Sequence, residues 1–143
     1  MYKHCLAHFP TSDIAILSAA VADYKADKRS PIKIKSTSDT FQLNLIRTID
    51  IAFELGKKKH EKQLLVGFAL ETNDEMHNAR EKLMRKNFDM IVLNSLNEKG
   101  AGFGYDTNKV SIIDKDNNIH NFGLKSKDEV ASDILKLVTE KIH

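Results

Sequence analysis

Short apolar runs alternate with amphipathic stretches along most of this chain. Three runs are typical of parallel strands buried on both faces, at 14–17, 64–68 and 90–93. Apolar residues recur at helical spacing around these runs and predict four helices, at 1–9, 49–59, 72–87 and 126–142. This alternation predicts an α/β fold: a Rossmann-like, three-layer, mostly parallel sheet with helices on both faces.

Polar residues predict where these helices begin. Thr48 is a candidate N-cap for the helix over 49–59. Residues 72–75 and 126–129 each match the Ser/Thr-x-x-Glu pattern of a capping box. The helix that starts at 72 is expected to end near Lys86, with Met76, Ala79 and Leu83 on its apolar face.

Other segments read as antiparallel structure. Residues 41–45 alternate strictly, with Phe41, Leu43 and Leu45 on one side, which predicts a strand with one wet face. A hairpin is expected from 109–113 and 119–122 across a turn at 116–118. A glycine-rich loop over 94–108 precedes it.

Size and charge limit the possible functions. At about 150 residues per domain, 143 residues predict a single domain, 1–143. The net charge is 22 − 20 = +2, which argues against nucleic-acid binding by bulk charge. No apolar run approaches the roughly 18 residues of a membrane helix, and no signal peptide is visible. The single cysteine, Cys5, fits a reducing compartment, so we expect a cytoplasmic protein with neither nucleic acid nor membrane as a partner.

Candidate chemistry gathers at the ends of the three apolar runs. In open α/β sheets, ligands bind beyond the carboxyl ends of the strands. Here 18–23, 68–72 and the stretch from Asn94 onward carry small or polar residues. These residue types suit the floor of a cleft, but they also suit ordinary turns, and both interpretations stay open. Asp23 is likewise either a site residue or a cap.

Two lysine pairs are candidates for binding phosphate. Lys82 and Lys86 are four residues apart and share a helix face, where a triphosphate would relieve their mutual repulsion. Their alternative is a solvated basic face near a helix C-terminus. Lys33 and Lys35 share one side of an extended segment, which suits either phosphate binding or the protection of an edge strand.

Four segments carry a family resemblance. They occur in one order and register along nearly the whole chain: SAAVADY at 18–24, KIK at 33–35, VGFALET at 66–72, and 79–94 with its two lysines and the sequence DMIVLN. Together they resemble phosphopantothenate–cysteine ligase, the synthetase half of the bacterial bifunctional coenzyme A biosynthesis flavoprotein.

The resemblance implies a CTP-dependent ligation of an acid to an amine. The carboxylate of 4′-phosphopantothenate attacks the α-phosphate of CTP and releases pyrophosphate. The amine of cysteine then takes the acyl group and releases CMP. Mg²⁺ is expected with the CTP, and FMN only in the decarboxylase domain that this sequence lacks. A ligase that uses ATP and a non-catalytic nucleotide-binding and dimerisation module remain alternatives.

The resemblance also implies particular site residues. Lys33 would be catalytic and serve the α-phosphate, while Lys82 and Lys86 hold the outer phosphates. Phe68 would pack against the nucleotide, and Asp23 would orient it by hydrogen bonding. Small residues would supply a nucleotide contact at Ala19 and a substrate contact at Ala20. The family's Asn-Pro-Asp-Ile motif of nucleotide contacts falls on Thr48, Ile49, Asp50 and Ile51, with Ala52 following, and only its last two residues are kept here.

The family is dimeric, which implies a homodimer here. Residues 25–47 would form a strand flap that reaches toward the partner subunit, with the active site near the interface. The family's preceding half contains a Gly-Gly-Thr loop that this sequence lacks. We therefore expect the chain to be the later part of the synthetase domain, truncated at the N-terminus. Such a fragment would bind nucleotide but have little or no ligase turnover alone.

Overall fold

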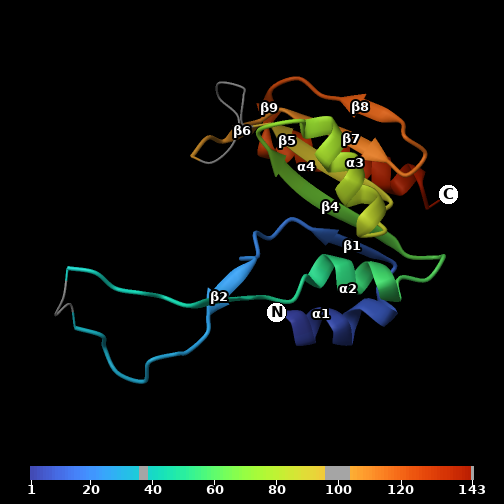
Figure 1. The fold of residues 1–143 in the computed structure, drawn as a ribbon. Coiled ribbons are helices and arrows are strands. Elements are labelled where there is room, and N and C mark those ends of the chain that lie inside the picture. The colour runs from blue at the N-terminus through green and yellow to red at the C-terminus, as the bar shows by residue number, and fades with distance from the viewer. Residues whose placement is uncertain (36–38, 96–103, 143) are drawn as a thin grey trace. The chain divides into compact units, whose positions relative to one another are not determined.

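The structure is a computed structural model that describes residues 1–35, 39–95 and 104–142 (Figure 1). It divides into two compact units, one formed by Met1–Ser18 with Ile51–His143 and the other by Ala19–Asp50. We call them the sheet unit and the arm, and each is described by itself. The predicted flap, 25–47, falls within the arm, and the single domain 1–143 stays a prediction.

A five-stranded sheet of order β1-β4-β5-β7-β8 organises the sheet unit. β1 (Ile14–Leu17), β4 (Leu64–Glu71) and β5 (Met90–Ser95) are parallel neighbours. β7 (Val110–Asp114) and β8 (Ile119–Asn121) continue the sheet as the predicted hairpin, antiparallel to β5. The α/β Rossmann-like fold class is confirmed.

Helices cover both faces of this sheet. They are α1 (Tyr2–His8), continued by the 3-10 turn η1 (Phe9–Thr11), α2 (Ile51–Lys58), α3 (Glu75–Arg85) and α4 (Lys127–Glu140). Successive β5 residues alternate between two apolar cores, because side chains of a strand point to opposite faces. Ile91 and Leu93 pack with residues of α1, α2 and α3, whereas Met90 and Val92 pack with α4.

The two expected capping boxes turn out differently. At α4 the box is present: Ser126 Oγ accepts from Glu129 N, and the Glu129 carboxylate accepts from Ser126 N. A short pairing of β6 (Thr107–Asn108) with β9 (Lys125–Ser126) leads into it. At α3 the N-cap is Asp74 rather than the expected Thr72, and Asp74 lies in the left-handed region, φ 44°, without a side-chain cap bond.

β1 differs from its expected burial. In the described part of the chain it is an edge strand that pairs only with β4. Ala15 and Leu17 pack against the core of α1–α3. Ile14 and Ile16, on the opposite face, are 36% and 38% exposed, because α4 packs over β5 and β7 instead. The expectation that β1 is buried on both faces is therefore wrong.

The arm has little internal packing. β2 (Tyr24–Ala26) and β3 (Leu45–Arg47) pair antiparallel, and every described residue of 19–50 except Thr48 is exposed. The strand expected over 41–45 is wrong, since pairing begins only at Leu45 opposite Ala26. Thr48 does not open the next helix: its Oγ1 donates to Ala22 O at 2.6 Å, and α2 begins at Ile51.

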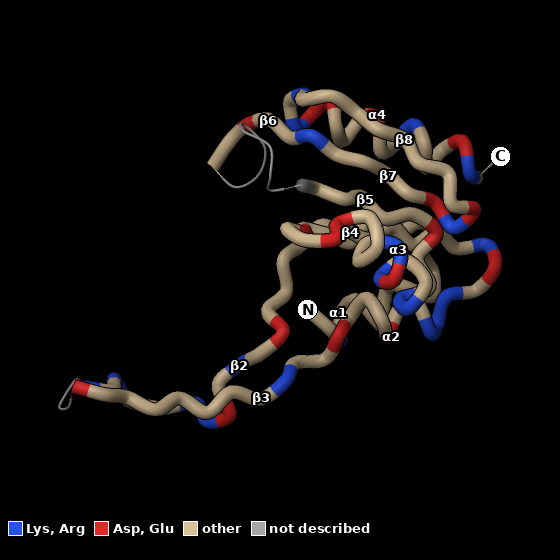
Figure 2. The backbone as a smooth tube through the Cα atoms, turned by 45° about the horizontal axis from the view of Figure 1, so that its top comes forward, with Lys and Arg blue, Asp and Glu red and all other residues tan. Residues whose placement is uncertain are grey.

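Three further features of the chain concern membrane helices, the glycine-rich loop and charge. None of the helices in the described ranges is long and apolar enough to cross a bilayer. Most of the expected glycine-rich loop, 96–103, lies outside the described residues. Basic and acidic residues are interspersed along the backbone rather than segregated, in line with the small net charge (Figure 2).

Candidate functional site

β4 and β5 end side by side. Leu70 pairs in register with Asn94, and Glu71 with Ser95, at the carboxyl ends of two central parallel strands (Figure 1). Strand ends of this kind are where the sequence predicts ligands. Pleating sends the side chains at this edge alternately to the α4 face and to the α3 face.

On the α4 face, the edge presents an apolar surface with one buried amide. Phe68 and Leu70 are each 38% exposed, although Val66, on the same face of β4, is fully buried against the α4 core. Asn94 points to this face too, and its Oδ1 is buried without a hydrogen-bond partner in the part of the chain that the structure describes. A buried acceptor left unpaired costs about 1–3 kcal/mol, so a ligand N–H or O–H would be favourable there.

Asn94 was not singled out from the sequence as a site residue. Its signal is an amide at the end of an otherwise apolar run, Met90–Leu93. That pattern alone does not separate a ligand contact from a turn residue. The distinction required the strand register and the missing hydrogen-bond donor.

On the α3 face, Lys82 reaches the end of β4 through an ion pair. Its Nζ contacts Glu71 Oε1, with side-chain exposures of 36% for Lys82 and 13% for Glu71. Asn78 Nδ2 donates to Glu71 Oε2 at 3.4 Å and to Asn73 O at 2.8 Å. Lys82 is therefore anchored by a carboxylate rather than being part of a freely solvated basic face.

Lys86 lies one turn further along the same helix, as the spacing predicted. It is the C-cap residue of α3 and lies four residues before the start of β5. Its backbone carbonyl closely approaches Gly56 of α2. The polypeptide at Lys86 is therefore held by helix packing, in contrast to Lys82, whose side chain is held by Glu71.

The remaining predicted residues belong to the arm or to its junction with α2. Ala19 and Ala20 precede β2, Asp23 immediately precedes it, and Lys33 is exposed between β2 and β3. Thr48 N donates to Asp23 O at 2.8 Å, so Asp23 lies beside Thr48, the first position of the motif, within the arm. Ile49 and Asp50 end the arm, and Ile51 with Ala52 begins α2. The meeting of Lys33 with Lys82 and Lys86 stays a prediction.

The described residues do not form a protein-built metal centre. Nowhere within the described ranges do three or more His, Cys, Asp or Glu side chains gather to hold an ion. Mg²⁺ commonly takes few protein ligands and binds through substrate phosphates.

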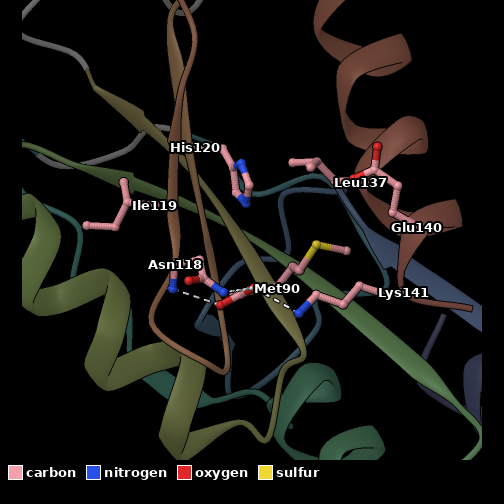
Figure 3. Close-up of a pocket in the computed structure, with 8 residues that line it drawn as sticks. Met90, Asn118, Ile119, His120, Leu137, Glu140 and Lys141 are labelled. Carbon is pink, nitrogen blue, oxygen red and sulfur yellow. Dashed lines mark hydrogen bonds and ion pairs between the residues drawn. The ribbon is translucent and has the colours of Figure 1, made fainter.

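A separate pocket of about 460 Å³ opens at the other end of the sheet, beside the start of β5 (Figure 3). Met90, His120 and Leu137 contribute to its lining. Two of its charged groups form an ion pair, since Lys141 Nζ lies 2.8 Å from Asp114 Oδ2, and Lys141 Nζ also lies 2.9 Å from Asp116 Oδ2. These ion pairs join α4 to the β7–β8 turn, and we assign them to the stability of the fold.

Comparison with known proteins gives a match over almost the entire chain. Residues 1–142 match the family model for the DNA/pantothenate metabolism flavoprotein C-terminal domain. A protein from an unknown prokaryotic organism, named cysteine/cysteine sulfinic acid decarboxylase, is 58% identical over 94% of this chain and 38% of its own length. The coenzyme A biosynthesis bifunctional protein CoaBC of Bacillus subtilis (strain 168) is 46% identical over 95% of this chain and 33% of its own length.

Solved structures extend the likeness to the fold. The C-terminal domain of a CoaBC protein matches with a TM-score of 0.77 and 38% identity, over 99% of this chain and 62% of that one. A Cab2 mutant in complex with phosphopantothenate-cysteine matches with a TM-score of 0.58 and 20% identity, over 91% of this chain and 46% of that one, which shows the fold alone. The chain spans about a third of the length of the curated relatives it matches.

Proposed function

Because this chain belongs to the DNA/pantothenate metabolism flavoprotein C-terminal domain family, we propose that it is the later part of a phosphopantothenate–cysteine ligase domain of coenzyme A biosynthesis. Its co-substrate is CTP and its amine substrate is cysteine. This chain covers only 38% of the relative that is named a decarboxylase and 33% of the CoaBC relative, so coverage alone does not separate the two activities. The ligase is preferred because the C-terminal domain of CoaBC itself matches 99% of this chain at 38% identity.

The observation that carries the proposal is the composition of the edge where β4 and β5 end. Phe68 offers an exposed ring to pack against the nucleotide, and the buried Asn94 Oδ1 accepts one of its N–H or O–H groups. The ammonium of Lys82, beside Glu71, contacts the outer phosphates together with Lys86. The apolar surface and the unpaired acceptor lie on the α4 face of this edge, and the cation of α3 lies on the other face beside the end of β4. A nucleotide that lies across the strand ends would contact all three groups, which suits a charged, partly apolar ligand better than an uncharged one.

Lys33 acts on the first chemical step. The carboxylate oxygen of 4′-phosphopantothenate forms a bond to the α-phosphorus of CTP as the bond to pyrophosphate breaks. Negative charge builds on the phosphoryl oxygens and on the leaving group, and a positioned ammonium stabilises it. The amine of cysteine then attacks the acyl carbon, and CMP leaves. Asp23 orients the nucleotide, and Ala19, Ala20 and the 49–52 segment admit close contacts through backbone or small side chains.

The arm serves as a dimerisation flap in this proposal. Its exposed apolar side chains include Ile32, Ile34, Phe41 and Leu43, and the arm gives them almost no internal core. Burial against a partner subunit removes this surface from water. We therefore propose a cytoplasmic homodimer with Lys33 near the interface.

ATP is the second candidate co-substrate. The motif at 48–51 keeps only the Asp50 and Ile51 of the family's Asn-Pro-Asp-Ile, so base contacts made by its first two residues differ here. This difference bears on which base is preferred and leaves the phosphate contacts unaffected.

Nucleotide binding is measured first on the 143-residue chain, by thermal unfolding with CTP, ATP and UTP in the presence of Mg²⁺. At 100 times its dissociation constant, the preferred nucleotide stabilises the fold by about 2.7 kcal/mol. Lys82→Ala weakens this effect, whereas Lys62→Ala, at an exposed lysine, leaves it unchanged. A chain that no nucleotide stabilises contradicts the proposal, and a larger effect of ATP selects the second candidate.

Lys33 is tested in a protein that carries this domain together with its preceding half. Lys33→Gln abolishes pyrophosphate release from CTP and phosphopantothenate and leaves the unfolding temperature unchanged. Lys28→Gln removes another exposed lysine of the arm and keeps the turnover. Wild-type turnover in Lys33→Gln contradicts the assigned role.

A further inference from the structure

We propose that Glu71 is a positioning residue that holds the ammonium of Lys82 at the carboxyl end of β4 for the outer phosphates of the nucleotide. This inference rests on the proposed function and extends it to a residue to which neither the family resemblance nor the lysine spacing assigns a role. Lys82, which is assigned to the outer phosphates, already has a carboxylate partner in Glu71.

Three elements hold the carboxylate in place. Glu71 is the last residue of β4, and its backbone is paired with Ser95 of β5. Its Oε2 accepts from Asn78 Nδ2, and the same amide group also donates to Asn73 O in the β4–α3 connection. Strand, connection and helix therefore fix the carboxylate, and its side chain is largely buried, at 13% exposure.

The ammonium is in turn fixed by the carboxylate. Lys82 lies one helical turn after Asn78, so the two side chains share the face of α3 that looks toward Glu71. A lysine side chain without such a partner loses much rotamer freedom when it binds an anion. Here Glu71 Oε1 already restricts it in the absence of nucleotide, so less freedom remains to be lost on binding.

The pairing leaves donors for a ligand. An ammonium group has three N–H donors, and Glu71 Oε1 accepts one of them. Lys82 is still 36% exposed, so a phosphate oxygen can approach the remaining donors. Because the ion pair of Lys82 and Glu71 is nearly neutral as a whole, it attracts anions weakly at long range and acts only on a phosphate in direct contact with it. A nucleoside monophosphate lacks the outer phosphates that Lys82 contacts, so the pair should favour a triphosphate over a monophosphate.

The test compares the dissociation constants of CTP and CMP by calorimetry on the 143-residue chain. In Glu71→Ala we expect the constant for CTP to rise about five- to tenfold and that for CMP to stay within about twofold. Glu71→Gln keeps an acceptor for the ammonium and recovers most of the CTP affinity. Glu71→Asp keeps the charge but moves it one methylene group away from Lys82, so its dissociation constant for CTP should lie between those of the unchanged chain and Glu71→Ala. Glu81→Gln, at an exposed carboxylate one residue before Lys82, is the matched control.

A double-variant cycle separates this inference from the proposed function. The double variant Glu71→Ala/Lys82→Ala should bind CTP no more weakly than Lys82→Ala alone. If Lys82→Ala weakens CTP binding but neither Glu71→Ala nor Glu71→Asp does, the positioning role is wrong and the nucleotide site stands. If Lys82→Ala has no effect, both fail. If Glu71→Ala does not fold, Glu71→Asp is used in its place. For a partly unfolded variant the ratio of the dissociation constants of CTP and CMP is compared, because unfolding changes both constants by the same factor.

Discussion

A buried carboxylate at the end of β7 joins three parts of the sheet unit. Asp114 is 2% exposed and accepts hydrogen bonds from Asn118 N at 2.9 Å and Asn118 Nδ2 at 3.0 Å, within the hairpin turn. Lys141, just after α4, lies 2.8 Å from its Oδ2. Burial by itself would raise the pKa of Asp114. The hydrogen bond and positive charge of Lys141, together with the hydrogen bonds from Asn118, outweigh burial and lower that pKa to about 2.

This lowered pKa predicts an acid-dependent stability. A carboxylate whose pKa falls on folding stabilises the protein above its unfolded pKa, here 3.8, and loses that contribution as the pH falls through about 2. Asp114→Asn should lower the free energy of unfolding by about 2 kcal/mol at neutral pH, and by progressively less below pH 4. Urea unfolding between pH 2 and pH 7 measures it. If Asp114→Asn lowers the free energy of unfolding equally at pH 2 and pH 7, the lowered pKa is not the cause of the stabilisation. Asp116→Asn, which removes the exposed partner of Lys141, is the control.

At the scale of elements, α2 approaches the end of α3 very closely. A Cβ added at Gly56 would lie 1.9 Å from the backbone oxygen of Lys86, far inside contact distance. Asn87 reinforces the contact, because its Nδ2 donates to Gly56 O at 2.8 Å. Only glycine allows this approach, and it sets where the C-terminal end of α3 lies.

Gly56→Ala should therefore separate the two helices. We expect the free energy of unfolding to fall by about 1–3 kcal/mol. This loss outweighs the helix propensity of alanine, which usually stabilises a helix by about 1 kcal/mol relative to glycine. Chemical denaturation measures the change. Gly123→Ala, where a new Cβ meets no atom within 4 Å, should be nearly neutral. A stabilised Gly56→Ala variant would show that the helices separate freely.

The elements that local sequence predicted correctly are those whose signals are complete within a few residues. Ser126 and Glu129 cap α4 reciprocally, and the run from Met90 to Leu93 is buried on both faces. Thr48 failed as a predicted cap because its hydroxyl bonds to Ala22 O, 26 residues away. The alternation of 41–45 failed as a strand signal because neither face of that segment is covered within the arm.

The sequence predicted where the candidate residues lie along the elements, but not their interactions. Glu71 ends β4, and Lys82 lies in α3 with Lys86 as its C-cap residue, as the strand pattern and the lysine spacing predicted, whereas the role of this edge as a ligand site stays a prediction. The partner of Lys82 was not predicted, since Glu71 precedes it by 11 residues and meets it only after the chain reverses from β4 into α3. The unpaired oxygen of Asn94 depends in the same way on strand register.

At the scale of the whole molecule, the arm predicts association. Paired substitution of Phe41→Ser and Leu43→Ser removes two exposed apolar side chains and should convert a dimer into a monomer. The unfolding temperature extrapolated to high dilution should stay unchanged. Sedimentation velocity measures the mass. Met84→Ser, at an equally exposed apolar residue of α3, should leave the dimer intact. A wild-type chain that sediments as a monomer contradicts the flap.

β1 has one further consequence. Its outer edge carries peptide groups that no other described strand pairs with, next to the partly exposed side chains of Ile14 and Ile16. An unpaired strand edge is a template on which another extended polypeptide, including a second copy of β1, can add. The purified chain should therefore aggregate slowly through pairing of its β1 edges. Ile16→Lys should suppress this aggregation, because a charge on the edge strand disfavours the pairing and leaves the inner strands of the sheet unchanged.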